Sequence, residues 1–332
     1  MAKVTIIGAG NVGATIANDL MVQNIASDIL LVDIKKNKAL GEAMDIYQGA
    51  PFLSPTYVHA GEYAEAAGSD IVVITSGMPR KPGQTRLDLA QTNVDILKQI
   101  IPEICPVCPD AIYILVSNPV DIMTYAFHKL SGIPESHIIG SGTILDTSRL
   151  QTILSNKFAI SPKSVLAYVY GEHGDASFIP WSLVHIANNP VDEYLLHAPR
   201  PEKITWDGDR AAIESYVKTS GAVIIENKGA TFYAVSMAVC YIVKCCLREI
   251  PTALTVSTLL HGEYGINDIC LSTLALINNE GIIGKITDNL TYTELETLHN
   301  CADKLKAVRD SLNLEVAKAE EKPKAKKATK AE

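Results

Sequence analysis

A histidine, an aspartate and an arginine in the middle of the chain are residue types that together could carry out acid–base chemistry. His173 stands between Glu172 and Gly174, directly after an apolar run, so its imidazole is expected at a strand end beside flexible backbone. A single histidine is more often structural. Asp146 and Arg149, however, are three residues apart, which places them on one face of a helix start. The three side chains together favour a reaction centre.

A glycine-rich turn near the N-terminus has the spacing of a dinucleotide-binding loop. Residues 8–13 read Gly-Ala-Gly-Asn-Val-Gly, follow an apolar strand at Val4–Ile7 and open a helix. In such a loop Gly8 permits the tight turn, Gly10 lets the backbone approach a pyrophosphate, and Gly13 lets helix and strand pack closely. The pyrophosphate would lie at the helix N-terminus, where N–H groups and the helix dipole favour negative charge.

An acidic residue completes this motif. Asp33 follows Gly13 by 20 residues and ends a second apolar strand at Ile29–Val32. Its carboxylate can accept hydrogen bonds from both ribose hydroxyls, whereas a 2′-phosphate there would meet like charge. The sequence therefore predicts NAD rather than NADP as the cofactor, bound by Gly8, Gly10, Asn11, Val12, Gly13 and Asp33.

Alternating strands and helices must position these residues. Buried strands that alternate with helices are typical of a doubly wound parallel sheet, so we predict the α/β fold class. The strands expected in the first half are Val4–Ile7, Ile29–Val32, Ile71–Thr75 and Ile112–Ser117, and the helices are Ala14–Met21 and Leu89–Ile101. Later elements are a strand at Val165–Tyr170 and helices at Arg149–Phe158, about Asp207–Leu247 with a break near Lys228–Gly229, and Tyr292–Leu312.

These patterns divide the chain into three parts. Residues 1–147 are predicted to form an NAD-binding domain, and residues 148–314 a second, α+β catalytic domain. Residues 315–332 are almost entirely Ala, Lys and Glu, so we expect a disordered or helical tail that cannot form a packed core.

The composition argues against several classes of function. The net charge of −8 is spread along the chain, which argues against nucleic acid and anionic membranes as partners. Apolar runs stay below the ~18 residues of a membrane span and a strand begins at Lys3, so we expect a cytoplasmic protein without a signal peptide. The seven cysteines suit neither a disulfide framework nor a zinc site, and no metal is predicted.

Five motifs in one order make the chain resemble the L-lactate/L-malate dehydrogenase family from Lys3 to about Leu312. They are the glycine turn with Asp33, the loop of residues 80–86, Ser117-Asn118-Pro119, Leu-Asp-x-x-Arg at residues 145–149, and Gly-Glu-His-Gly-Asp at residues 171–175. The resemblance implies a Rossmann domain followed by a catalytic domain, and NAD-dependent hydride transfer to and from a small L-2-hydroxy acid. It also implies a homodimer or homotetramer.

The resemblance assigns a role to each polar residue of the predicted site. His173 would be the general acid and base, and Asp146 would orient its ring and raise its pKa. Arg149 would bind the substrate carboxylate, and Arg86 would polarise the substrate carbonyl after its loop closes. Asn118 would hold the nicotinamide and the substrate pocket in register.

Substrate choice depends on the loop Ser76–Arg86, whose glycines and prolines suit a hinged lid. At the position of Arg80, malate-specific relatives also carry Arg, whereas lactate-specific relatives usually carry Gln. By this resemblance, Arg80 would pair with the second carboxylate of oxaloacetate. Glu172 and Thr231 resemble the lactate-specific branch, and Thr231 would narrow the space beside the substrate side chain. We therefore expect an L-lactate dehydrogenase, with dual specificity or an L-malate dehydrogenase as the alternatives.

Two further expectations concern allosteric activation and the possibility that the chain binds NAD without catalysing a reaction. Relatives activated by fructose 1,6-bisphosphate carry Arg and His where this chain has Gln151 and Leu166, so no such activation is predicted. A catalytically silent NAD-binding protein is the alternative on the same fold. Such a protein would lack His173, Asp146 or Arg149, and all three are present.

Overall fold

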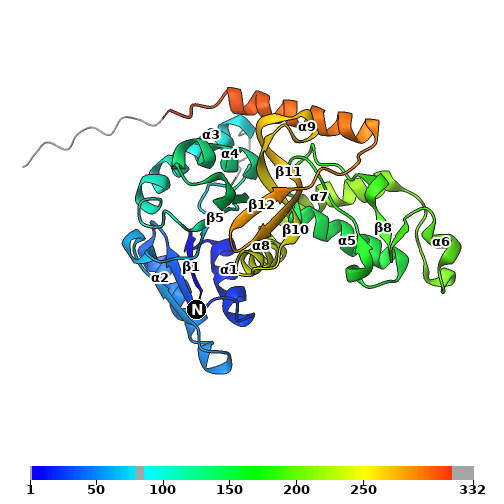
Figure 1. Cartoon of the computed structure of the whole chain (residues 1–332). Coiled ribbons are helices and arrows are strands. Elements are labelled where there is room, and N and C mark those ends of the chain that lie inside the picture. The colour runs from blue at the N-terminus through cyan, green and yellow to red at the C-terminus, as the bar shows by residue number, and fades with distance from the viewer. Residues whose placement is uncertain (1, 80–85, 316–332) are drawn as a thin grey trace, which may run out of the picture.

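The computed structural model describes residues 2–79 and 86–315. The predictions on Arg80, on the lid between residues 80 and 85 and on the tail from residue 316 onward lie outside the described residues, as does the side chain of Arg86. The described part forms a large sheet with helices on both faces and a smaller unit beside it (Figure 1). This architecture confirms the predicted α/β class.

The large sheet begins with six parallel strands from the first half of the chain. They are β1 Lys3–Ile7, β2 Asp28–Val32, β3 Tyr57–Ala60, β4 Ile71–Ile74, β5 Ile112–Leu115 and β6 Ile138–Gly140. Their order is β3-β2-β1-β4-β5-β6, so the order reverses at β1 and β4. This reversal leaves a crevice at the carboxyl ends of the strands, where dinucleotides bind in such folds.

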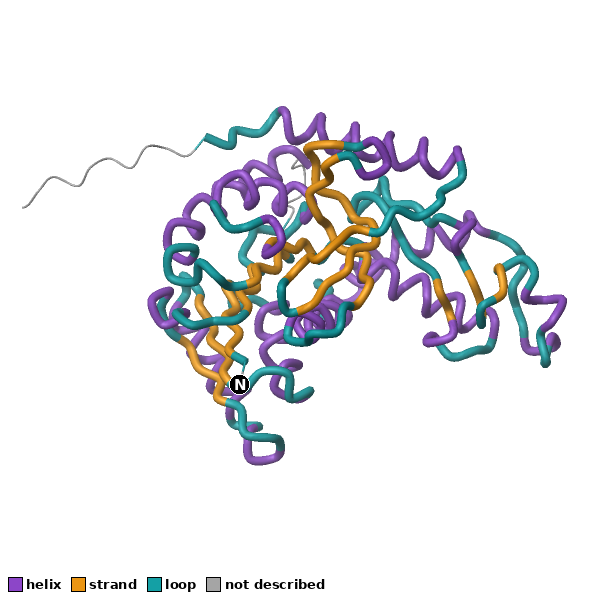
Figure 2. Tube along the Cα trace, in the orientation of Figure 1, coloured by secondary structure: helices purple, strands orange, loops and turns teal. Residues whose placement is uncertain are grey.

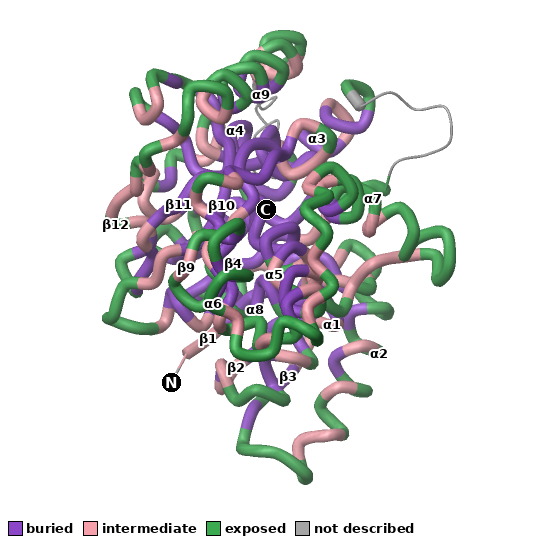
Figure 3. Tube along the Cα trace, turned by 90° about the vertical axis from the view of Figure 1, so that its right-hand side faces the viewer, coloured by how far each residue is buried: buried purple, intermediate pink, exposed green. Residues whose placement is uncertain are grey.

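Helices cover both faces of this sheet because its strands carry apolar side chains on both sides. One face packs against α1 Asn11–Val22, α2 Lys36–Tyr47 and α8 Tyr233–Cys246. The other face packs against α3 Arg86–Ile104 and α4 Val120–Ser131. Figure 3 shows the buried centre between these layers.

A smaller unit with its own apolar core follows. It contains α5 Ile144–Phe158, β7 Val165–Leu166, β8 His185–Ile186, β9 Asn189–Pro190, α6 Tyr194–His197 and α7 Arg210–Lys228. The three short strands form a separate antiparallel sheet. The predicted break is confirmed, because α7 ends at Lys228 and Gly229 has φ +84°.

Three strands from the second half then return to the large sheet, which the sequence patterns did not predict. They are β10 Thr252–His261, β11 Asn267–Asn278 and β12 Gly281–Lys285. Ser257 of β10 pairs antiparallel with Gly140 of β6, so nine strands in the described residues form one mixed sheet (Figure 2). Helix α9 Tyr292–Asp310 packs on β11. The sheet therefore crosses the domain boundary predicted at Thr147.

The strand predicted at Val165–Tyr170 is wrong beyond Leu166. Side chains, rather than a neighbouring strand, bind the backbone there. The Val169 N–H donates to Thr147 Oγ1 at 2.9 Å, and the Ala167 carbonyl accepts from Gln151 Nε2 at 3.2 Å. Regular pairing returns only as a bridge between Tyr170 and Phe178.

A search of the helices within residues 2–79 and 86–315 finds none with the length and apolar character needed to cross a membrane.

Candidate active site

Three successive backbone N–H groups of the His173 loop are held by neighbouring elements. The N–H of Gly171 donates to the carbonyl oxygen of Ser272 in β11 at 2.9 Å. The N–H of Glu172 donates to the sulfur of Cys301 in α9 at 3.0 Å. The N–H of His173 itself donates to Asp121 Oδ2 in α4 at 2.8 Å. The histidine backbone is thus fixed from three sides before its ring makes any contact.

Asp146 and Arg149 come from the first turns of α5 and meet His173. Asp146 is 4% exposed, and its Oδ2 lies 2.5 Å from His173 Nδ1. Its Oδ1 accepts a hydrogen bond from Arg149 Nη1 at 2.8 Å, and the same nitrogen lies 3.4 Å from the carbonyl oxygen of Val217 in α7. Since Nδ1 is engaged, Nε2 of His173 is the ring nitrogen that can act on a substrate.

Burial and charge act in opposite directions on this pair. Burial lowers the pKa of His173, but the Asp146 carboxylate, its hydrogen bond and the charge of Asp121 together raise the pKa above its ordinary value. Burial raises the pKa of Asp146, but His173 and Arg149 lower it to below its ordinary value. At neutral pH Asp146 is therefore an anion beside a histidine that keeps its proton to higher pH than usual.

The glycine turn has the geometry that a pyrophosphate needs. Gly8 has φ +108°, and a Cβ on Gly13 would lie 1.9 Å from the Gly8 carbonyl oxygen, so neither position accepts a side chain. A Cβ on Gly10 would meet nothing within 4 Å, which leaves open space beside the backbone. Helix α1 begins at Asn11 without a side-chain cap, so its first N–H groups can receive an anion.

Asp33 lies beside this turn at the end of β2. Its Oδ2 accepts from the Ala9 N–H at 2.7 Å, and its Oδ1 accepts from the Lys35 N–H at 2.8 Å. A carboxylate oxygen can accept more than one hydrogen bond, so these contacts orient the group and leave capacity for ribose hydroxyls. The turn and Asp33 together fit NAD.

Asn118 follows β5 at the same edge of the sheet. Asn93 of α3, which is 1% exposed, donates from Nδ2 to the Asn118 carbonyl at 2.6 Å and accepts from the Met78 N–H at 2.7 Å. Asn93 thereby links Met78, in the described first part of the predicted lid loop, to Asn118. Thr231 lies half-buried in the connection between α7 and α8, and Arg86 is the first residue of α3.

The structure therefore brings Asp146 into direct contact with both His173 and Arg149. It places the glycine turn, Asp33 and Asn118 at the carboxyl ends of parallel strands. Sequence reasoning did not find Asp121 and Cys301, although both contact the His173 loop. The position of Asp121, three residues after Asn118 at the start of an apolar helix, was the available signal.

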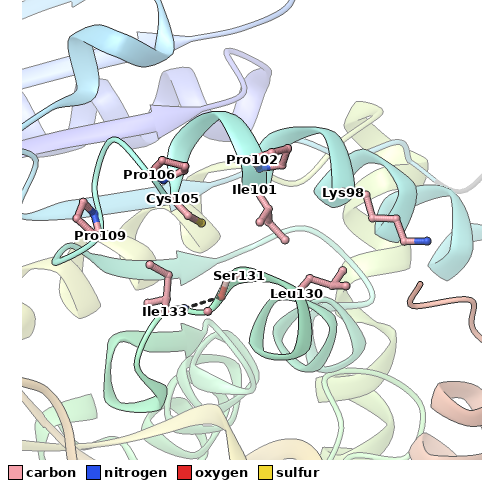
Figure 4. Close-up of a pocket in the computed structure, with 10 residues that line it drawn as sticks. Lys98, Ile101, Pro102, Cys105, Pro106, Pro109, Leu130, Ser131 and Ile133 are labelled. Carbon is pink, nitrogen blue, oxygen red and sulfur yellow. Dashed lines mark hydrogen bonds between the residues drawn. The ribbon is translucent and has the colours of Figure 1, made fainter. Parts of the chain in front are cut away.

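Two cavities lie away from this cluster. One, of about 440 Å³, lies between the C-terminal ends of α3 and α4 (Figure 4). Most of the side chains that line it are apolar, and the Cys105 thiol is one of the lining groups. Burial raises the pKa of that thiol to about 11, which disfavours a reactive thiolate. The other, of about 590 Å³, lies between α5, α8 and β10. The described residues that line either cavity include neither His173 nor Asp146.

Comparisons with known proteins agree over nearly the whole chain. Residues 2–140 match the family model for the lactate/malate dehydrogenase NAD binding domain, and residues 143–315 match that for the lactate/malate dehydrogenase alpha/beta C-terminal domain.

Individual relatives and solved structures carry related names. An L-lactate dehydrogenase of Clostridium botulinum (strain Langeland) is 44% identical and covers 92% of this chain and 95% of that protein. One of Synechococcus sp. (strain JA-3-3Ab) is 41% identical over 93% of this chain and 99% of that protein. The crystal structure of a minor L-lactate dehydrogenase from Enterococcus mundtii has a TM-score of 0.89 at 36% identity, covering 95% of this chain and 99% of that one.

Proposed function

Because this chain belongs to the lactate/malate dehydrogenase family, we propose that it is an NAD-dependent L-lactate dehydrogenase, which reduces pyruvate to L-lactate and catalyses the reverse reaction. The observation that carries the proposal is the cluster of His173, Asp146 and Arg149, because it joins a proton donor, its counter-ion and a carboxylate-binding group in one place.

In this proposal the glycine turn and Asp33 hold NAD, with Asn118 near its nicotinamide. The bound cofactor supplies a hydride for the carbonyl carbon of pyruvate, or accepts it from L-lactate in reverse. The protein must then supply a proton to the carbonyl oxygen and hold the substrate carboxylate.

His173 donates that proton from Nε2 and takes it back in lactate oxidation. Asp146 stays ionised throughout, fixes the ring through Nδ1 and stabilises the imidazolium. Arg149 binds the substrate carboxylate with N–H groups of its five-donor guanidinium. Arg86 polarises the carbonyl, so that the developing negative charge on oxygen meets a cation.

Arg80 bears on how strictly pyruvate is selected. A pocket arginine would pair with the second carboxylate of oxaloacetate and would be left unpaired with pyruvate. Thr231 opposes the larger substrate by narrowing the pocket. Since the curated relatives above are named L-lactate dehydrogenases, we place pyruvate first and treat oxaloacetate as a secondary substrate.

The test is the oxidation of NADH by the purified full-length chain with pyruvate or oxaloacetate. We expect turnover with pyruvate, and a loss of roughly 10²- to 10⁴-fold in kcat for His173→Asn. His197→Asn, an exposed histidine on α6, is the matched control and should retain wild-type kcat. Absence of pyruvate reduction by the wild type would reject the proposal.

Arg80→Gln tests substrate choice in the same assay. We expect kcat/KM for oxaloacetate to fall by about 10-fold or more, with pyruvate kcat/KM unchanged or improved. A strong wild-type preference for oxaloacetate that this substitution abolishes would instead identify an L-malate dehydrogenase.

We also propose that two copies of the chain associate. Two surfaces expose large apolar side chains, Leu40 and Met44 on α2 and Met237 and Tyr241 on α8, each about half exposed. Met237 and Tyr241 also line the cavity of about 590 Å³. Apolar patches of this kind mark protein contacts. A cytoplasmic location remains a prediction from the sequence.

A further inference from the structure

A second buried carboxylate lies behind the catalytic loop. Asp121 is 1% exposed and belongs to the first turn of α4. Its Oδ2 accepts the backbone N–H of His173 at 2.8 Å, and its Oδ1 accepts the hydroxyl of Ser257 at 2.6 Å. Ser257 is fully buried in β10, the strand that attaches the second half of the chain to the large sheet.

Burial of the Asp121 carboxylate costs free energy unless its charge is compensated by neighbouring groups. Moving a charged carboxylate from water into an apolar interior is unfavourable, and an asparagine of the same shape could make both hydrogen bonds. The neighbouring N–H of the loop shows that a carboxylate is not needed to hold the backbone, because the sulfur of Cys301 accepts that N–H.

The charge of Asp121 does act on His173. Among the side chains that the structure describes, the charged groups that act on the histidine are Asp146 and Arg149 from α5 and Asp121 from α4. Asp146 and Asp121 raise the pKa of His173, whereas burial and Arg149 lower it. Asp121 also acts on the fully buried Cys270 of β11, whose pKa is strongly raised by burial first and by Asp121 next, so that it stays a neutral thiol.

We propose that Asp121 is a positioning residue with two functions: it fixes the backbone of His173, and its negative charge helps keep the imidazole protonated for pyruvate reduction. Ser257 holds the carboxylate in place from β10. The inference rests on the proposed function, because it assumes that His173 is the proton donor.

Asp121→Asn isolates the charge. The amide oxygen can still accept from the His173 N–H, and the amide nitrogen can donate to Ser257. We expect the falling limb of log kcat/KM for pyruvate to move to lower pH, so that activity relative to wild type drops by roughly 3- to 10-fold at pH 8 while changing little at pH 6.

Cys301→Ala is the matched control, because it removes the acceptor of the adjacent N–H without any change of charge. We expect it to lower kcat/KM by a similar factor at every pH and to leave the limb in place. A limb that is unmoved in Asp121→Asn, or moved equally by both substitutions, overturns the proposal.

Ser257→Ala decides the question if Asp121→Asn does not fold. Loss of the hydroxyl donor makes a buried carboxylate harder to ionise. The falling limb for pyruvate should then move to lower pH, in the same direction as in Asp121→Asn and by less, and an unmoved limb overturns the proposal. If the wild type itself does not reduce pyruvate, the proposed function has failed, whereas an active wild type with unshifted variants rejects only the role of Asp121.

Discussion

Asp146 is the residue on which the chemistry of the site depends, because it contacts both the proposed proton donor and the proposed carboxylate-binding group. It lies 2.5 Å from His173 and 2.8 Å from Arg149 in a nearly dry environment. In such surroundings an isolated carboxylate would be costly, and two cationic partners offset that cost. Replacement of either partner therefore alters the other two residues.

The pH dependence of Asp146→Asn follows from these charges. With the carboxylate removed, burial and Arg149 lower the pKa of His173, and the charge of Asp121 opposes them by less than Asp146 did. Pyruvate reduction requires protonated His173, so its kcat/KM should begin to fall at lower pH than in the wild type. Lactate oxidation requires the neutral ring, so its rising limb should move to lower pH as well.

Measurement of kcat/KM in both directions between about pH 5 and 10 checks this prediction. Asp110→Asn, which removes an exposed charge in the turn before β5, serves as the control and should leave both limbs in place. Limbs that move in opposite directions would show that Asp146 does not act through the histidine pKa.

At the scale of elements, the junction of β1 with α1 separates folding from cofactor binding. Gly13→Ala would force a Cβ to 1.9 Å from the Gly8 carbonyl oxygen, whereas Gly10→Ala meets nothing within 4 Å and has φ −76°, which alanine adopts freely. Substitution of Gly13 should therefore reduce stability, whereas substitution of Gly10 should weaken cofactor binding.

We expect Gly13→Ala to lower the free energy of unfolding by about 2 kcal/mol or more, as overpacking does. Gly10→Ala should change stability by less than ~1 kcal/mol but weaken NADH binding by about 10-fold or more, since the methyl group occupies the approach of the pyrophosphate. Urea unfolding and NADH fluorescence titration distinguish these outcomes. Gly41→Ala on α2, where a Cβ also meets nothing within 4 Å, is the control for both measurements.

At the scale of the whole molecule, the exposed apolar faces predict association. Met237→Glu places a charge on the α8 surface and should convert the oligomer to monomer at micromolar concentration, because an interface would bury that charge unpaired. Light scattering measures the mass. Tyr292→Glu changes an 80% exposed residue at the start of α9 and should leave the mass unaltered. A monomeric wild type would contradict the prediction.

Activation by fructose 1,6-bisphosphate is the second property of the whole molecule that can be tested. The two positions that would supply cationic groups hold Gln151, whose amide binds the Ala167 carbonyl at 3.2 Å, and Leu166, which is 47% exposed. Neither side chain carries a positive charge that could neutralise a phosphate. Pyruvate saturation curves with and without the sugar bisphosphate should therefore coincide, and a leftward shift would refute this expectation.

Local sequence determined the cofactor half of the site and most of the Rossmann strands. The glycine spacing reflects close backbone approaches within a few residues, and the apolar strands Val4–Ile7 and Ile29–Val32 are recognisable because both of their faces are buried. Asp33 was identifiable for the same reason, since it ends such a strand. The family resemblance added the roles of His173 and Arg149, which local pattern alone left open.

Only the tertiary structure decided which distant groups meet. Asp146 and His173 are 27 residues apart, and Ser257 is 136 residues from Asp121, yet each pair is in hydrogen-bond contact. The strands β10 to β12 join the parallel sheet because β10 pairs with β6, the last of its parallel strands, and no local pattern specifies a partner that far along the chain. The charge that surrounds His173 is therefore a property of the fold, because it is the sum of groups that packing alone brings together.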